Sequence, residues 1–223
     1  MKTPITSAAL KHHITYNFWK YILIAILAFG LVDLLYSATA YKPPRDKIIE
    51  LNVYGMMDEP ALAEYMSSVQ ASEMSDMEEM KPVQIMDDDY YGPMQLLTWM
   101  ANGQGDVYVL PHDEFVNHAS TGAFVALEDD AELMALFNEA GVSLQSGWRR
   151  DTETGETHLF GIPLSRLPGL DRYAYARDGY LCVAVTGGNI ENALKFTRIL
   201  CRDMITAPEP AAEDTQTAEP PAL

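Results

Sequence analysis

The chain has 223 residues, which is enough for one globular domain with attachments and a sizeable core. Its formal net charge is -17, but residues 1–41 hold three lysines and a single acid, so residues 42–223 carry -19. Such an acidic domain repels polyanions, which excludes nucleic acid and anionic lipid surfaces as its partners. The cysteines Cys182 and Cys201 stand in apolar patterns, and we expect buried thiols rather than a disulfide or a metal pair.

The N-terminal region contains an apolar run that is long enough to cross a bilayer. Residues 21–40 read YILIAILAFGLVDLLYSATA, and a helix of this length spans about 30 Å. Ten of them are Leu, Ile, Val or Phe, which together favour insertion by about 3 to 6 kcal/mol. Asp33 costs roughly 2.5 to 3.5 kcal/mol at most, so insertion is favoured overall. We predict a transmembrane helix over residues 21–41, in contact with the lipid bilayer, after a short cytoplasmic segment of residues 1–20.

A second interpretation of this region is a secretory signal peptide. Residues 38–40 (ATA) have the small-x-small form of a cleavage site, after a lysine-bearing start and an apolar core. The apolar run is longer than the usual signal core of about 7 to 15 residues, which favours a retained anchor. Both interpretations place the chain after residue 41 outside the cytoplasm, and we predict a single-pass protein of the cell membrane.

The domain expected over residues 42–205 begins with an alternation of strands and helices. Residues 47–54 (KIIELNVY) predict the first strand, and the helix that follows has Asp58 as its cap and a proline in its first turn. Residues 71–81 (ASEMSDMEEMK) are acidic and dotted with methionine, and we expect them to be loosely ordered. A second strand over residues 82–86 ends at three consecutive aspartates.

The middle of the domain continues this alternation. A helix from Pro93 carries Leu96, Leu97 and Met100 as its apolar residues and ends near Gly103. The elements predicted next are a buried strand over 107–110, a short helix over 112–121, a strand over 124–127 and a helix over 131–140.

The last part of the domain predicts a hairpin, a strand and a helix. Residues 144–150 and 156–162 flank the turn DTETG and predict a β-hairpin. Residues 180–185 predict a buried strand and residues 190–205 the final helix. Residues 206–223 predict a disordered acidic tail rich in proline and alanine. The whole pattern predicts an α/β domain with a mixed sheet of about five strands, with ligand sites at the carboxyl ends of strands.

Three segments resemble one lobe of the bacterial extracytoplasmic solute-binding proteins of ABC transporters. Residues 96–129 are similar to the helix, G-x-G-D turn, strand and short helix of that family, and residues 158–165 (HLFGIPLS) and 189–200 (NIENALKFTRIL) are similar to later parts of it. The resemblance covers roughly residues 47–205 and implies a membrane-anchored, shortened member with one periplasmic-binding-protein-like lobe. It also implies a transporter permease or another envelope protein as partner. Because a full member closes two lobes around its ligand, no binding residue is carried over to this chain.

Candidate ligand-binding residues follow two predicted strands. The first turn supplies Asp88, Asp89, Tyr90 and Tyr91, and the second supplies His112 and Asp113. Because the carboxyl ends of parallel strands meet at one edge of a sheet, we expect both turns at that edge. The competing interpretation is structural: Asp113 caps the following helix by accepting hydrogen bonds from the amides of Phe115 or Val116.

Patterns for metal binding and catalysis are weak in this sequence. His112 and His118 are six residues apart, so they cannot share a helix face as the zinc pattern H-E-x-x-H requires. The methionines at 74, 77 and 80 could supply soft ligands for Cu(I), but methionine is abundant throughout the chain. The chain contains no G-x-S-x-G and no nucleotide-binding glycine motif. We predict no metal, no cofactor and no enzymatic activity.

Two classes of function stay open at this point. One is a membrane-tethered extracytoplasmic solute-binding-like domain, non-catalytic, that binds a small ligand near residues 87–92 and 111–115 or assists a transporter. The alternative is an interaction or assembly protein at the cell envelope, which keeps the lobe as a scaffold without ligand binding. A cleft lined by aromatic side chains would favour the first, and an apolar surface patch near residues 90–100 would favour the second.

Overall fold

The computed structural model describes residues 7–88, 90–176 and 178–205, with side chains from residue 15 onward. Asp89 and the predicted tail over 206–223 therefore lie outside the described residues. The chain divides into two compact units, Met1–Lys42 and Pro43–Leu223, and each unit is described by itself.

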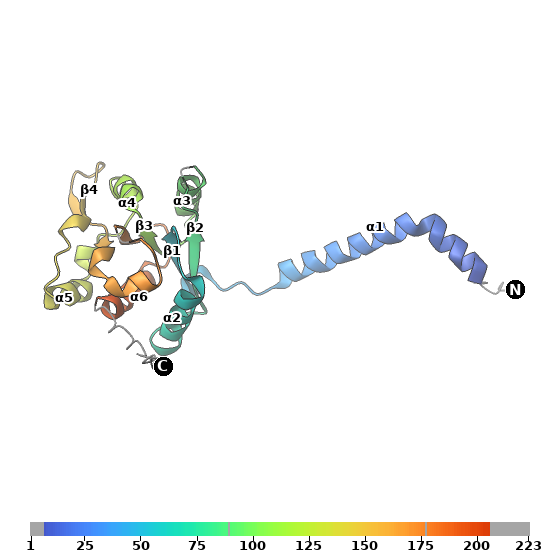
Figure 1. Cartoon of the computed structure of the whole chain (residues 1–223), viewed down its shortest axis with the longest axis horizontal. Coiled ribbons are helices and arrows are strands. Elements are labelled where there is room, and N and C mark those ends of the chain that lie inside the picture. Colours follow the sequence, from blue (N-terminus) through green and yellow to red (C-terminus); the bar gives the residue numbers. More distant parts are fainter. Residues whose placement is uncertain (1–6, 89, 177, 206–223) are drawn as a thin grey trace, which may run out of the picture. The chain divides into compact units, whose positions relative to one another are not determined.

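The first unit contains one long helix, α1 (Ser7–Thr39) (Figure 1). Its part Thr15–Thr39 is long and apolar enough to cross a membrane, by length and composition only, and a signal sequence would meet the same criteria. None of its described side chains is buried. We expected the helix to begin at residue 21, but it begins at Ser7 and includes the chain ahead of the apolar run.

A mixed sheet of five strands forms the centre of the second unit, in the order β2-β1-β3-β7-β6. Strand β1 (Ile48–Tyr54) is parallel to β2 (Glu79–Ile85) on one side and to β3 (Val107–Leu110) on the other. Strand β7 (Tyr180–Val183) is antiparallel to β3 and pairs with the short β6 (Ile162–Pro163). This arrangement confirms the predicted mixed sheet of about five strands.

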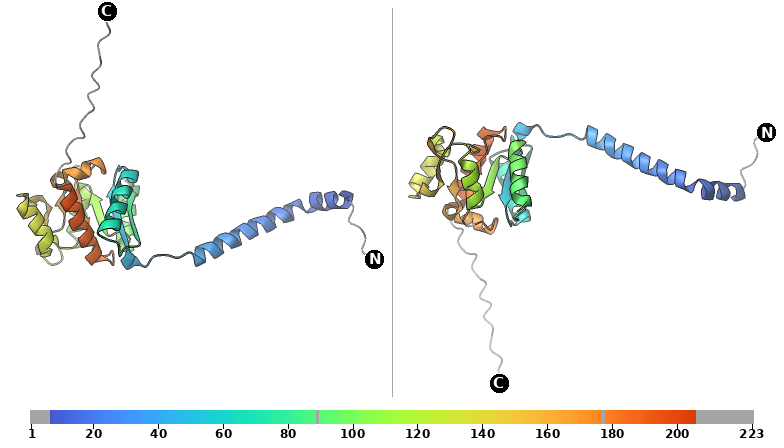
Figure 2. Two further views of the ribbon diagram at one scale, coloured as in Figure 1. Left: turned by 90° about the horizontal axis from the view of Figure 1, so that it is seen from below. Right: turned by 90° about the horizontal axis from the view of Figure 1, so that it is seen from above.

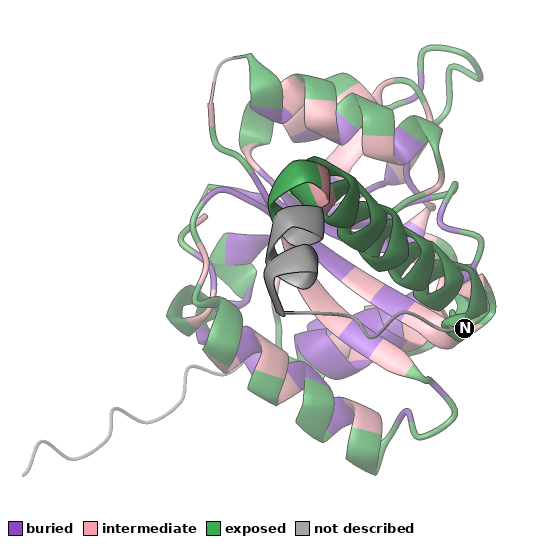
Figure 3. Cartoon of the chain, turned by 90° about the vertical axis from the view of Figure 1, so that its right-hand side faces the viewer, coloured by how far each residue is buried: buried purple, intermediate pink, exposed green. Residues whose placement is uncertain are grey.

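Helices cover both faces of the sheet (Figures 1 and 3). The buried residues of α2 (Glu59–Ser72), α5 (Ala131–Glu139) and α6 (Ile190–Met204) join one apolar cluster. Those of α3 (Tyr91–Ala101) and α4 (His112–Ala119) join a second cluster on the opposite face. Figure 2 shows the same two layers from below and from above.

Short elements complete the domain. Strands β4 (Trp148–Arg150) and β5 (Thr157–Leu159) form the predicted hairpin, shorter than expected. The short 3-10 helices are η1 (Arg45–Lys47), η2 (Leu127–Asp129), η3 (Gln145–Gly147), η4 (Leu164–Arg166) and η5 (Pro168–Arg172).

The central strand β3 shows why a continuous apolar run folds into this position. Val107 and Val109 belong to the apolar cluster of α2, α5 and α6, whereas Tyr108 and Leu110 belong to that of α3 and α4. Successive side chains of a strand point to opposite faces, so a strand covered on both sides is apolar at every position. The predicted burial of residues 107–110 is confirmed.

The methionine-rich stretch over residues 71–81 corrects one expectation. It is not loosely ordered: α2 continues to Ser72, β2 begins at Glu79, and Met74, Met77 and Met80 are buried. All three lie in the apolar cluster of α2, α5 and α6. Flexible thioether side chains fill this part of the core while the acids between them remain at the surface.

Three smaller expectations are also wrong. Residues 124–127 do not form a strand, because only Phe124 pairs, through a single bridge to Ala184. Val185 is exposed, since β7 ends before it. Leu97, expected with the apolar residues of its helix, points to the surface instead, while Leu96 and Met100 are buried.

Candidate functional site

The carboxyl edge of the sheet brings distant segments together. Strands β1, β2 and β3 are parallel and end at this edge, whereas β7 is antiparallel to β3 and begins there. Two hollows lie along the edge, of about 240 Å³ and about 310 Å³. They adjoin, because both are lined by His112, Asp178 and Gly179.

Each hollow has its own further wall. The smaller hollow is lined also by Tyr54 and Gly55 at the end of β1, by Asp87 after β2, and by Tyr175. The larger is lined also by Ser146, Pro163, Ser165 and Tyr180. The walls therefore combine tyrosine side chains, two carboxylates, two hydroxyls and one imidazole.

Two glycines shape the floor of this region. Gly55 has a φ of 109°, a conformation that residues with a side chain rarely adopt, and it turns the chain as it leaves β1. Gly179 allows close backbone approach, since a Cβ there would lie 2.7 Å from the carbonyl oxygen of Leu110. A side chain at Gly179 would push β7 away from β3 at the point where both meet the hollows.

An aromatic column supports His112 at the start of α4. The His112 ring lies 5.8 Å from the Tyr180 ring, and Tyr180 stacks on Phe115 with ring centroids 4.1 Å apart. The Arg149 guanidinium lies 5.2 Å from the Phe115 ring centroid and 5.8 Å from that of Tyr180. These contacts fix the rings and place one cation beside them, at a distance typical of cation–π interaction.

Four polar side chains at the hollows are available to a ligand. His112, Ser146, Ser165 and Asp178 are all exposed. Among the residues that the structure describes, no hydrogen bond or ion pair holds any of these four side chains. Together they offer both donors and acceptors of hydrogen bonds.

The first predicted turn contributes less than expected. The Asp88 carboxylate accepts hydrogen bonds from the amides of Tyr90 (2.9 Å), Gly92 (3.2 Å) and Tyr91, so it caps α3. Desolvation would raise the pKa of Asp88, but these three hydrogen bonds outweigh it and lower the pKa. Neither Asp88 nor the two tyrosines line the hollows; Asp87 does. Tyr90 and Tyr91 are exposed and pack edge to face, 5.2 Å apart.

Only one of the two candidate residues of the second predicted turn lines the hollows. His112 lines both hollows, whereas Asp113 lines neither and is exposed. The expected cap by Asp113 is wrong: the capping residue is Pro111, no side chain caps this helix, and the Phe115 amide donates to the Pro111 carbonyl oxygen at 3.0 Å. The helix begins at His112, as expected, so Asp113 lies within its first turn rather than before it. There a negative charge still interacts favourably with the helix dipole.

Sequence reasoning missed most of the residues around the hollows. Asp178 and Gly179 immediately precede a predicted strand, which gave no reason to place them at the carboxyl edge. They reach it because β7 is antiparallel to its neighbour. Ser146 and Ser165 arrive through 3-10 segments, η3 and η4, that carry no periodic pattern.

The described residues contain no group of three or more His, Cys, Asp or Glu side chains placed to hold a metal ion. The thiols of Cys182 and Cys201 are buried, and burial raises the pKa of both thiols, so neither is a ready nucleophile. The imidazole, carboxylates and hydroxyls that line the hollows can make hydrogen bonds, and the tyrosine rings can make aromatic contacts.

Similarity to known proteins is found in structure and not in sequence. No protein-family model matches the sequence, and no curated protein matches it. An extracellular solute-binding protein family 1 from Alicyclobacillus acidocaldarius subsp. acidocaldarius is similar in structure, with 18% sequence identity and a TM-score of 0.40. The match covers 56% of this chain and 29% of that chain, so this chain spans less than a third of the solved protein.

Proposed function

We propose that the protein is a non-catalytic binding domain, held outside the cytoplasm by α1, that takes a small polar ligand at the carboxyl edge of its sheet. The observation that carries this proposal is the wall shared by the two hollows. There His112 and Asp178 stand exposed over a glycine floor, and no hydrogen bond within the described residues occupies either side chain.

The lining indicates what kind of ligand fits. Carboxylates of Asp87 and Asp178 accept hydrogen bonds from hydroxyl or ammonium groups, and the seryl hydroxyls on the other side can donate. The larger hollow, about 310 Å³, lies at the lower end of the usual size for small-molecule sites. We therefore expect a small molecule rich in hydroxyl or amino groups, bound weakly because the site is open on one side.

Ligand-observed NMR tests this proposal. The full chain in phosphatidylcholine nanodiscs is mixed with a panel of small polyols and primary amines, and saturation transfer reports weak binding. We expect binding that is lost in His112→Ala and in Asp178→Asn and kept in Asp113→Asn. The Asp113 variant is the matched control, since Asp113 neighbours His112 but lines neither hollow. A wild-type chain that binds no member of the panel, or variants that bind as well as wild type, would contradict the proposal.

The tether has a separate test. External protease applied to intact cells should remove the acidic domain, and N-terminal sequencing of the membrane-bound protein should find the chain start rather than a new end near residue 41. A domain protected from protease would reverse the topology. A new N-terminus near residue 41 would show that the apolar segment is a cleaved signal peptide and not an anchor. The sequence ATA at residues 38–40 has the form of such a cleavage site.

A second candidate function, an interaction or assembly protein at the cell envelope, is favoured by a different observation. Several large apolar side chains on and beside α3 are exposed. Soluble surfaces seldom expose such a group of neighbouring apolar side chains unless they bind a partner.

A further inference from the structure

Helix α3 is apolar on two sides, and the protein covers only one of them. Its buried side carries Gly92, Leu96 and Met100. On the other side Tyr91, Met94 and Leu97 are 64%, 54% and 61% exposed. The helix contains no charged residue at all. A helix on the surface normally turns a polar face to solvent, so this outer face of α3 lacks a partner.

The exposed side of α3 borders a groove. The groove has a volume of about 510 Å³. It lies between Met86 at the exit of β2 and the α3 residues Tyr91, Met94, Gln95, Thr98 and Trp99. Positions 91, 94 and 98 are spaced by three and four residues, so the groove follows the helix axis for about two turns. The apolar side chains of this lining, Met86, Tyr91, Met94 and Trp99, can pack against the apolar stripe of another helix.

The charge around this groove has one sign. Residues 82–120, which include α3 and α4, hold six acids and no lysine or arginine. Helices α3 and α4 lie side by side over the same face of the sheet (Figures 1 and 2). Asp87 and Asp88 stand at the N-terminal end of α3, and Asp113 and Glu114 lie in the first turn of α4.

No lysine or arginine is among the described residues that line the groove. The Lys81 ammonium pairs with Glu79 at 2.7 Å and with Glu50 at 3.4 Å. The Arg149 guanidinium keeps its charge, but it lies over the Phe115 and Tyr180 rings and does not line the groove. The face therefore presents an apolar groove inside an acidic surround.

We propose that the groove on α3 docks an amphipathic helix of a partner protein, with an apolar stripe against α3 and lysine or arginine on its flanks. Charge complementarity argues against the other occupants. A second copy would bring another acidic domain against this one, and an anionic bilayer would be repelled as well. This surface is separate from the carboxyl-edge hollows, and the proposal does not rest on ligand binding there.

The test uses the full chain in phosphatidylcholine nanodiscs, with empty nanodiscs as the blank. The probe is an 18-residue synthetic helix with leucines along one side and lysines elsewhere. Two matched peptides replace the lysines by glutamates or scramble the leucines. We expect the lysine peptide to bind about tenfold more tightly than either matched peptide, with an affinity that falls as salt rises.

Variants locate the binding on α3. Met94→Gln combined with Tyr91→Gln should weaken binding of the lysine peptide about tenfold, since both exposed side chains line the groove. Ile190→Gln is the matched control, an exposed apolar residue on α6, which covers the opposite face, and it should bind like wild type. Unchanged circular dichroism and melting temperature confirm that the variants fold.

Three results would overturn the proposal. The first is equal binding of the lysine and glutamate peptides, because the charge argument would then be void. The second is a double variant that binds as tightly as wild type, which would place binding elsewhere. The third is a wild-type chain that binds no peptide and sediments as a dimer, while the double variant sediments as a monomer. A second copy of the chain would then be the occupant of the groove.

Discussion

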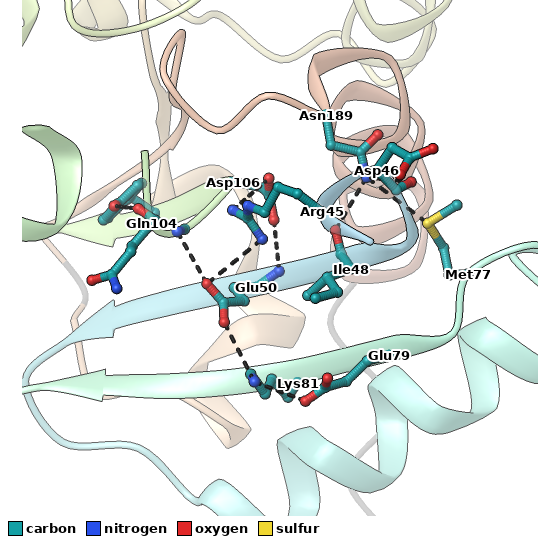
Figure 4. Close-up of polar contacts among 12 residues, drawn as sticks. Arg45, Asp46, Ile48, Glu50, Met77, Glu79, Lys81, Gln104, Asp106 and Asn189 are labelled. Carbon is teal, nitrogen blue, oxygen red and sulfur yellow. Dashed lines mark hydrogen bonds and ion pairs between the residues drawn. The ribbon is translucent and has the colours of Figure 1, made fainter. Parts of the chain in front are cut away.

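Asp106 provides a direct test of the electrostatics at the amino edge of the sheet. Its side chain is fully buried, lies 3.0 Å from the Arg45 guanidinium and accepts a 2.9 Å hydrogen bond from the Glu50 amide (Figure 4). Burial raises the pKa of Asp106 to about 6, because desolvation outweighs the hydrogen bond from Glu50 and the charge of Arg45. The perturbation we consider is Asp106→Asn, which keeps the shape of the side chain and removes the titrating group.

The sign of the effect follows from proton linkage. The folded state binds the proton of Asp106 more tightly than the unfolded state, whose pKa is near 3.8. The stability that this group contributes is therefore fully present below about pH 4 and is lost as the pH rises through 6. A difference of roughly two pKa units corresponds to about 2 to 3 kcal/mol in the free energy of unfolding.

Chemical denaturation between pH 4 and 7.5 measures this quantity in the full chain, held in a neutral detergent and followed by tryptophan fluorescence. The free energy of unfolding of Asp106→Asn is subtracted from that of wild type at each pH. We expect this difference to rise by about 2 kcal/mol in favour of wild type as the pH falls from 7.5 to 4. Asp46→Asn removes an exposed acid next to Arg45, and this variant should reproduce the wild-type profile.

Two results would refute this reasoning. A difference that stays flat across the range would mean that Asp106 does not titrate there in the folded state. A difference that moves in favour of the variant on acidification would mean that the pairing with Arg45, rather than desolvation, controls the carboxyl group.

Three further predictions concern other parts of the domain. The 2.6 Å hydrogen bond to Glu128 raises the pKa of His158 in the folded state. The stability that protonated His158 contributes is therefore present below pH 6.5 and is lost as the pH rises through the folded pKa. His158→Gln should remove this pH dependence from the melting temperature. Asp58→Ala should cost about 0.5 to 2 kcal/mol, because the Asp58 carboxylate accepts from an α2 amide, whereas Asp113→Ala should cost less than about 0.5 kcal/mol in the same urea titration. Leu96→Ala should cost about 2 to 5 kcal/mol, since the side chain is fully buried, and an unchanged urea midpoint would contradict the α3 packing described above.

The sequence by itself determined the local elements, because their signals are local. The run Val107–Leu110 predicts a strand covered on both faces, and the structure has it at the centre of the sheet. Asp58 and the proline after Glu59 predict the start of α2, and the cap is present. The apolar run of α1 needs no tertiary contact at all to be recognised, since length and composition suffice.

Only the tertiary structure decided which strands pair and which side of each helix is buried. The direction of β7 depends on its pairing with β3, across some seventy residues of chain, and that pairing brings Asp178 and Gly179 to His112. Periodicity shows that α3 is apolar but not which side the sheet will cover, so Leu96 is buried while Leu97 is exposed. Long-range packing determines the order of the strands and which face of each helix is buried. The sequence pattern within one element does not specify either of them.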